Sequence, residues 1–261
     1  MKQKIVLTAV IIAVITLIIA APKLLRPAAL DCPEICAFAE ENNLSLRAYP
    51  KALVSLYERN PEARDFVLNF PLKKDSEQDY EITLPEDGSV PLFMQWDERW
   101  GYEEYSGEIM GLSGCGPTAL SMAAVYLLGD PSLSPAYIAD FSEENGFSSR
   151  NNGTSWTLMN EGAQQLGLCS GEVPLWEASM AEALSEGKLI VCAMGKGDFT
   201  STGHFVLLTG YSEGLFSLND PNSRARSGRL WSYSKLESQI RGMWALSAPV
   251  QENECETTIT E

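Results

Sequence analysis

The sequence has few basic residues for its length. Its 261 residues include 19 Lys and Arg against 35 Asp and Glu, which gives a net charge of −16. None of the acidic residues lies in residues 1–26, so the rest of the chain carries all of them. The phosphate backbone of DNA or RNA repels a body this acidic. The charge therefore excludes nucleic acid as an expected partner.

Histidine and cysteine are also scarce. The sequence has one histidine, His204, and its six cysteines are too few for a disulfide scaffold. It shows no cluster of metal-ligating residues and no glycine-rich phosphate-binding motif, so we expect no cofactor. Hydrophobic residues make up 45% and charged residues 21%. This composition is globular and excludes a mostly disordered, collagen-like or multi-span membrane protein.

One long apolar run is present near the N-terminus. Residues 5–21 carry no charge, follow Lys2 and Lys4, and reach the lower limit of length for a helix that spans a bilayer. Pro22 follows directly, and Ile19 is bulky where signal cleavage needs a small residue. We therefore predict a signal anchor in residues 1–26, with the body outside the cell membrane. A cleaved signal peptide, which would leave a secreted protein, is the alternative.

The remaining chain divides by composition. Residues 27–72 are predicted to be helical, with an interruption at Pro61, which together with Glu62 suits the first turn of a helix. Residues 73–89 are polar and turn-rich, as in a linker. The main domain is predicted at 90–248, and residues 249–261 form a polar tail.

Inside the main domain, helix patterns give way to strand patterns. Three helix patterns come first, at 116–129, 155–167 and 177–187, and each ends at a glycine. Strand patterns follow at 188–194, 204–211, 214–219 and 243–248. A capping-box pattern from Ser234 to Glu237 predicts one more helix. This order predicts an α+β fold with an antiparallel sheet.

His204 begins the strand pattern at 204–211. A lone histidine in a strand is more often structural than catalytic, but its predicted neighbours favour chemistry. If the hairpin folds about Ser212, His204 lies opposite Asp220, and a shift of one residue brings Asn219 there instead. Either side chain could accept a hydrogen bond from the imidazole and orient it as a general base.

Cys115 is the candidate nucleophile, in the segment Leu-Ser-Gly-Cys-Gly-Pro-Thr. It lies at the start of a predicted helix, where free backbone N–H groups and the helix dipole stabilise a thiolate. Gly114 and Gly116 would leave room for a substrate and let the backbone amide point at a developing oxyanion. A buried structural cysteine near a helix cap is the alternative.

Between Val90 and Trp244 the chain resembles the C39-like cysteine peptidases, a papain-like group related to the processing domains of bacteriocin exporters. The matching segments, in order, are VPLFMQWDERWGYEEY, GLSGCGPTALSMAAVYLLG, GTSWTLMNEGAQQLGL, GDFTSTGHFVLLTGY and FSLNDPNSRARSGRLWSYSKLESQIRGMW. The preceding YPKALVSLYERNPEARDFVLNFP is similar to the lead-in of secreted Gram-positive members. The resemblance implies a papain-like peptidase fold, with N-terminal helices packed on a C-terminal antiparallel sheet.

The resemblance also implies roles for four residues. Cys115 would be the nucleophile, His204 the general base and Asp220 the residue that orients the imidazole. Gln95 would correspond to the glutamine whose amide stabilises the tetrahedral intermediate. The exporter peptidases place that glutamine only a few residues before the cysteine, whereas here a much longer segment separates the two.

The other cysteines and several aromatic residues give weaker signals. Cys32 and Cys36 stand one helical turn apart, so free thiols or a disulfide are expected there rather than zinc. Cys192 is expected in the core, and Cys169 and Cys255 suggest no role. Five aromatic residues flank the predicted cleft as either core or substrate wall: Trp96, Trp100, Tyr102, Tyr105 and Trp156.

Together these features predict a membrane-anchored, extracytoplasmic thiol hydrolase. It would cleave a peptide or isopeptide bond in a peptide or protein substrate through an acyl-enzyme. An acyltransferase or amidase on the same fold is one alternative, and a non-catalytic binding module on a peptidase scaffold is another. The presence of Cys115, His204 and Asp220 argues against the binding module.

The first prediction concerns the apolar run at 5–21. Because Pro22 disfavours cleavage, the mature protein should keep Met1–Ala21 and fractionate with membranes, and protease added to intact protoplasts should remove the body. Mass spectrometry of the N-terminal peptide checks this. A soluble secreted form that begins after residue 21 would contradict the anchor but leave the enzyme hypothesis intact.

Overall fold

The computed structural model describes residues 27–76, 80–150 and 153–249. The predicted signal anchor and nearly all of the predicted polar tail lie outside these residues. Within the described ranges, no helix combines the length and the apolar character needed to cross a bilayer. The chain divides after Leu72 into two compact units.

The first unit is helical. Its described elements are three short 3-10 helices and three α-helices: η1 (Ala28–Asp31), α2 (Pro33–Glu41), η2 (Leu46–Ala48), α3 (Lys51–Arg59), η3 (Pro61–Ala63) and α4 (Arg64–Lys73). Pro61 opens η3, and the side chain of Asn60 accepts a hydrogen bond from the backbone N–H of Glu62. The predicted interruption at Pro61 is therefore confirmed, and it separates α3 from α4.

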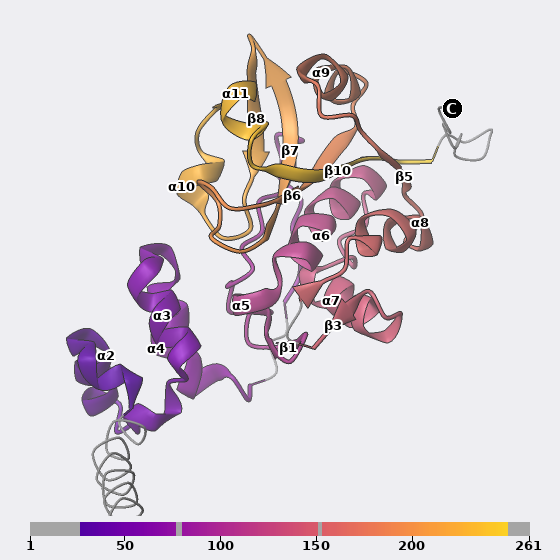
Figure 1. Ribbon diagram of the computed structural model, residues 1–261. Helices are drawn as coiled ribbons and strands as arrows, with labels where there is room; N and C mark the ends of the chain where they lie inside the picture. The colour runs from indigo at the N-terminus through magenta and orange to yellow at the C-terminus, as the bar shows by residue number, and fades with distance from the viewer. Residues whose placement is uncertain (1–26, 77–79, 151–152, 250–261) are drawn as a thin grey trace, which may run out of the picture. The chain divides into compact units, whose positions relative to one another are not determined.

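The second unit is built on a six-stranded antiparallel sheet of order β5-β10-β6-β7-β8-β9 (Figure 1). The strands are β5 (Cys169–Glu172), β6 (Leu189–Met194), β7 (His204–Ser212), β8 (Leu215–Asn219), β9 (Trp231–Ser232) and β10 (Ile240–Ser247). Four of them match the predicted strands. The main helices of this unit are α5 (Met110–Ser113), α6 (Cys115–Leu128), α7 (Pro135–Glu144), α8 (Ala163–Gln165) and α9 (Glu177–Ser185).

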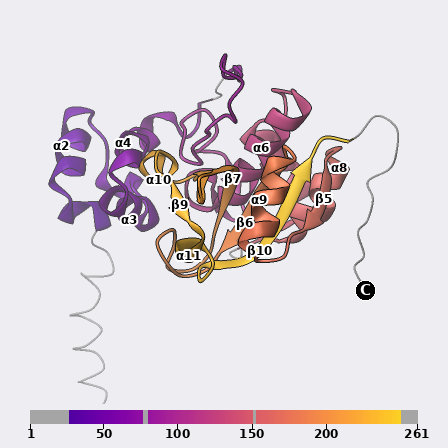
Figure 2. The same ribbon diagram turned by 90° about the horizontal axis from the view of Figure 1, so that it is seen from above.

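Helices cover both faces of the central strands (Figure 1 and Figure 2). On one face, Val191 of β6 and Leu207 of β7 belong to the same buried cluster as the apolar residues of α6. On the other face, Cys192 and Val206 cluster with Met180 of α9. All six residues of β6 are buried, as expected for a strand covered on both sides. The structure confirms the α+β class.

The hairpin of β7 and β8 differs from its predicted register. Its turn is Glu213-Gly214, both with positive φ (53° and 80°), and Ser212 pairs with Leu215. A two-residue turn of this kind matches the right-handed twist of the strands. A bulge between Leu208 and Gly210 then shifts the register again, so that Leu207 pairs with Asn219. The prediction that His204 lies directly opposite Asp220 is therefore wrong.

Other elements also depart from the sequence patterns. The capping box at Ser234 does not start a helix, because α11 (Tyr233–Leu236) begins after Ser232 and is one turn long. The pattern at 155–167 forms a π-helix, η4 (Leu158–Gly162), followed by α8. The edge strand β5 and the helix α7 have no counterpart in the predicted elements. Two short hairpins, β1 (Glu104–Tyr105) with β2 (Glu108–Ile109) and β3 (Ser148–Ser149) with β4 (Gly153–Thr154), also join the unit.

The turn of the β7–β8 hairpin yields a stability prediction. Glu213 lies in the left-handed region at φ 53°, where asparagine is tolerated better than glutamate, so Glu213→Asn should stabilise the protein by about 0.5 kcal/mol. Gly214→Ala should destabilise it by about 1 kcal/mol, because φ 80° disfavours any residue with a Cβ. Urea denaturation measures both effects, and a stabilising Gly214→Ala would contradict this description of the turn.

Candidate active site

Cys115 is the first residue of α6 and is partly exposed. The helix follows directly on α5, with Gly114 between the two, and the hydroxyl of Thr118 donates to the backbone oxygen of Gly114 (2.8 Å). The ten residues from Gly116 to Val125 are buried. The core therefore fixes the helix, and the backbone of Cys115 at its start has little freedom to move.

The two glycines beside Cys115 are required by close packing. A Cβ on Gly116 would lie 2.7 Å from the Cβ of Thr154, and one on Gly114 would lie 2.7 Å from the backbone oxygen of Met110. Thr154 is itself held by a hydrogen bond between its hydroxyl and that of Tyr105 (2.8 Å). The sequence analysis assigned these glycines to substrate access. The structure shows a packing role for both glycines, which is to let α6 approach α5 and β4 closely. Substrate access stays a prediction.

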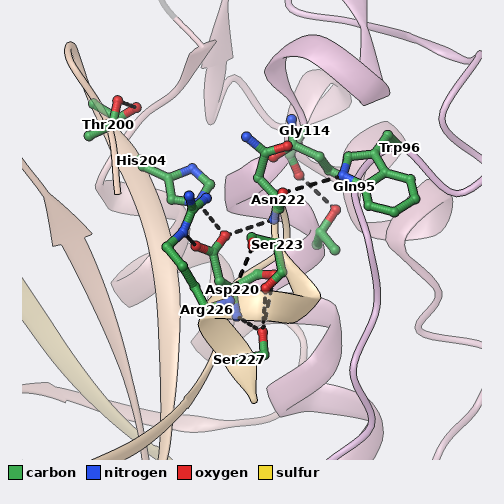
Figure 3. Close-up of polar contacts among 12 residues, drawn as sticks. Gln95, Trp96, Gly114, Thr200, His204, Asp220, Asn222, Ser223, Arg226 and Ser227 are labelled. Carbon is green, nitrogen blue, oxygen red and sulfur yellow. Dashed lines mark hydrogen bonds and ion pairs between the residues drawn. The ribbon is translucent and has the colours of Figure 1, made fainter. Parts of the chain in front are cut away.

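His204 is the first residue of β7, where it pairs with Met194 of β6. Its side chain is buried, and its Nε2 lies 2.8 Å from Oδ1 of Asp220, whose side chain is fully buried (Figure 3). The imidazole also interacts with the side chain of Cys115, and this interaction contributes to the raised pKa of His204. Since Nε2 is engaged by Asp220, Nδ1 is the nitrogen left for the thiol. The structure thus brings Cys115, His204 and Asp220 together in that order.

Asn219, the alternative partner of His204, is held elsewhere. Its side-chain amide donates to the backbone oxygens of Val90 and Pro91 (3.4 and 3.0 Å). Asp220 comes one residue after the end of β8, so the strand register does not constrain its position. This is why the Asp220 carboxylate reaches the imidazole although the predicted register is wrong.

The Asp220 carboxylate has two further partners. Its Oδ1 accepts a hydrogen bond from the backbone N–H of Asn222 (2.7 Å), and its Oδ2 lies 2.5 Å from Nε of Arg226 in α10 (Arg224–Ser227). Burial alone would raise the pKa of Asp220, but the charges and hydrogen bonds of His204 and Arg226 outweigh burial and lower it. The carboxylate is therefore ionised at neutral pH.

His204 responds in the opposite direction. Burial alone would lower its pKa, but the negative charge and hydrogen bond of Asp220, together with the interactions with Cys115, raise the pKa to about 10. The imidazole is therefore protonated at neutral pH. An imidazolium beside a cysteine at a helix start is the environment that favours a reactive thiolate.

Gln95 lies at the junction of α5 and α6. Its side chain is buried, its Nε2 donates to the backbone oxygen of Gly111 (3.1 Å), and Figure 3 places it beside Gly114. Its backbone N–H donates to the oxygen of Pro221, one residue after Asp220 (2.7 Å). Its Oε1 is buried and makes no hydrogen bond within the described residues. A carboxamide has two N–H donors, and the hydrogen bond to Gly111 uses one of them.

The aromatic residues and the other cysteines singled out in the sequence lie either in the core or at the surface. Four of the five aromatic residues are buried, and the fifth, Trp156, is about half exposed and packs edge-on against Trp244 (5.6 Å between ring centroids). Cys32, Cys36 and Cys192 are free thiols, and burial raises the pKa of Cys192 and that of Cys32. Within the described part of the chain, no group of side chains could hold a metal ion.

Comparison with known protein families assigns the chain to one of them. The model of a family described as "Peptidase_C39 like family" matches residues 88–250, which is more than half of the chain. The chain therefore belongs to the C39-like peptidase family. Among curated proteins, none matches the chain.

Two solved structures are similar to parts of the chain. The peptidase domain of Streptococcus ComA, a bifunctional ABC transporter involved in a quorum-sensing pathway, is 19% identical, with a TM-score of 0.41, covering 52% of this chain and 93% of that one. A C39-like peptidase from Bacillus anthracis is 14% identical, with a TM-score of 0.39, covering 66% of this chain and 100% of that one.

Arg226 is the residue of this site that the sequence analysis missed. Six positions separate it from Asp220, and the intervening segment shows no helical or strand periodicity that would predict their contact. Only the backbone turn, in which Asp220 N–H donates to Ser227 Oγ (2.8 Å), brings the two side chains together. A cation near an acidic residue in sequence is too common to have been informative.

The raised pKa of His204 predicts a dependence of stability on pH. The folded protein keeps this proton to about pH 10, whereas the unfolded chain releases it near pH 6.5. The stabilisation is therefore complete below pH 6.5 and is lost as the pH rises to about 10. In this window the free energy of unfolding should fall more steeply in the wild type than in His204→Gln, by up to about 1.4 kcal/mol per pH unit. Urea denaturation between pH 7 and 9 measures the slopes, and equal slopes would contradict the assignment.

Proposed function

We propose that the chain is a cysteine peptidase that hydrolyses a peptide or isopeptide bond through an acyl-enzyme on Cys115. The observation that carries this proposal is the position of His204, which is hydrogen-bonded to the buried Asp220 carboxylate and interacts electrostatically with Cys115. A structural histidine in a strand needs one partner for burial. One that links a buried carboxylate to a partly exposed thiol at a helix start has the connections of a general base.

In the first step, the Cys115 thiolate attacks the carbonyl carbon of the scissile bond. The carbonyl oxygen becomes an oxyanion, which the backbone N–H of Cys115 and the second N–H of Gln95 would stabilise. The protonated His204 then gives the proton on Nδ1 to the leaving amine as the C–N bond breaks. Asp220 remains ionised throughout and stabilises the imidazolium by its hydrogen bond to Nε2.

In the second step, water replaces the amine. The now neutral Nδ1 of His204 takes a proton from the water, whose oxygen attacks the thioester carbon. The C–S bond breaks, and the carboxylic acid product leaves while Cys115 returns to the thiolate and His204 to the imidazolium. The pKa of about 10 supports this cycle, because the imidazolium form that protonates the leaving amine predominates at neutral pH.

The location of the enzyme belongs to the same proposal. The uncharged run at residues 5–21 supports a membrane anchor with the peptidase outside the cytoplasm. The strongly acidic body supports a peptide or protein substrate and not a nucleic acid. Acyl transfer to an amine in place of water would use the same residues, and the test below distinguishes the two outcomes by the product formed.

The test of this function compares the thiols. A limiting amount of iodoacetamide at pH 6 should alkylate Cys115 before Cys36 and Cys192, because only Cys115 has an imidazolium partner among the described thiols. His204→Ala should slow the labelling of Cys115 at least tenfold. Mass spectrometry of the digested protein measures both effects.

Digestion of a peptide library provides the second half of the test. The wild type should cleave a subset of peptides, Cys115→Ala should cleave none, and the matched variant Cys36→Ala should retain full activity. Mass spectra of the products distinguish hydrolysis from acyl transfer to an added amine. If Cys115 labels no faster than Cys36 and no peptide is cleaved, the peptidase proposal fails and a binding module takes its place.

A further inference from the structure

A second cation shares the buried carboxylate of the site. The Nε of Arg226 lies 2.5 Å from Oδ2 of Asp220, on the carboxylate oxygen that His204 does not use (Figure 3). Asp220 is fully buried, whereas the side chain of Arg226 is about one-quarter exposed. One negative charge thus lies between two positive groups, and only one of them belongs to the chemistry proposed above.

The backbone of Arg226 is fixed from both sides. Its N–H donates to the hydroxyl of Ser223 (3.2 Å), and its carbonyl oxygen accepts a hydrogen bond from the indole of Trp231 (3.2 Å). Its guanidinium also lies 5.9 Å from the ring centroid of Phe199, in the loop that leads to His204. These contacts hold the guanidinium in one place, so its bond to Asp220 is built into the fold and is not a transient surface ion pair.

The carboxylate of Asp220 has little freedom to rotate. Oδ1 accepts from Nε2 of His204 and from the backbone N–H of Asn222, and Oδ2 accepts from Arg226. Without Arg226, Oδ2 would be a buried acceptor with no charged partner, which is costly and would favour rotation of the carboxylate away from the imidazole. The position of His204 therefore depends on Arg226 through the carboxylate that the two residues share.

The charged groups that face this pair can be named from each neighbouring element. Asp220, one residue after β8, faces His204 of β7 and Arg226 of α10, and His204 faces Asp220 and Cys115 of α6. Removing one cation from such a group increases the proton affinity of every member that remains. A neutral residue at position 226 should therefore move all the titrations of the site to higher pH.

We propose that Arg226 is a positioning residue, which fixes the Asp220 carboxylate against His204 and sets the pH range over which the Cys115–His204 pair is reactive. The inference rests on the proposed function for its biological meaning. The interaction that it describes, among the side chains of Arg226, Asp220 and His204, can be measured without a substrate.

The experiment compares three variants by the rate of Cys115 alkylation between pH 4 and 11. Arg226→Gln removes the charge and keeps an N–H that can donate to Asp220, while Arg226→Lys keeps the charge and loses the planar guanidinium. Arg229→Gln is the matched control, because it removes an equal charge from a guanidinium that lies over Trp231 (4.2 Å from the ring centroid). As His204 is the only histidine in the sequence, its imidazole NMR signals report its titration without assignment by mutation.

The profile of Cys115 alkylation rate against pH has an acidic limb and an alkaline limb. In Arg226→Gln both limbs should move to higher pH by about half a unit or more, together with the NMR titration of His204. Arg226→Lys should keep the limbs of the wild type but alkylate more slowly at its maximum, since the single ammonium fixes the carboxylate less well. Arg229→Gln should match the wild type. If Arg226→Gln does not fold, the Lys variant still decides, because shifted limbs there would contradict the proposal.

Two results would overturn the inference. A rate that falls equally at every pH in Arg226→Gln, with unshifted limbs, would make Arg226 a structural residue only. An equal shift in Arg229→Gln would mean that net charge and not the bond to Asp220 is responsible. Failure of the peptidase proposal is recognised separately, because there the wild type itself shows no His204-dependent alkylation of Cys115 and cleaves no peptide.

Discussion

The candidate site depends on one buried carboxylate. Asp220 has no exposed surface, and an ion in this position is strongly destabilising unless hydrogen bonds and opposite charges compensate for its desolvation. His204 and Arg226 supply the charges, and the backbone N–H of Asn222 supplies a further donor. The same three contacts that make burial possible also fix the orientation of the imidazole. Stability and chemistry therefore rest on the same atoms.

Two rigid elements of the fold position the Cys115 thiol and the imidazole that binds this carboxylate. The buried helix α6 places Cys115 at its first turn, and the central strand β7 places His204 at its first residue. Gly114 and Gly116 let the start of the helix approach α5 and β4 more closely than any larger residue would allow. Because α6 and β7 pack in the same core, a shift of either would be opposed by many buried contacts.

The segment that carries Gln95 is hydrogen-bonded to the loop that follows Asp220. The backbone N–H of Gln95 donates to Pro221, and the indole of Trp96 donates to the backbone oxygen of Asn222 (3.5 Å). The loop after Asp220 is thus tied both to α10 and to this early segment of the domain. Residues more than a hundred positions apart in sequence share one small network, which explains why Gln95 can belong to the site despite its long separation from Cys115.

The sequence by itself determined the α+β class, a helix that begins next to Cys115 and four strands of the sheet, and its family resemblance pointed to Asp220 and not Asn219 as the partner of the lone histidine. These follow from local signals, namely apolar periodicity, helix-capping glycines and strand propensity, and from the family resemblance. Only the tertiary structure decided the register of the β7–β8 hairpin, because one turn residue and one bulge move every later pair. It also decided the packing role of Gly114 and Gly116 and the presence of Arg226 beside Asp220. Each of these depends on how closely two separate segments approach, and no spacing along the chain records that distance.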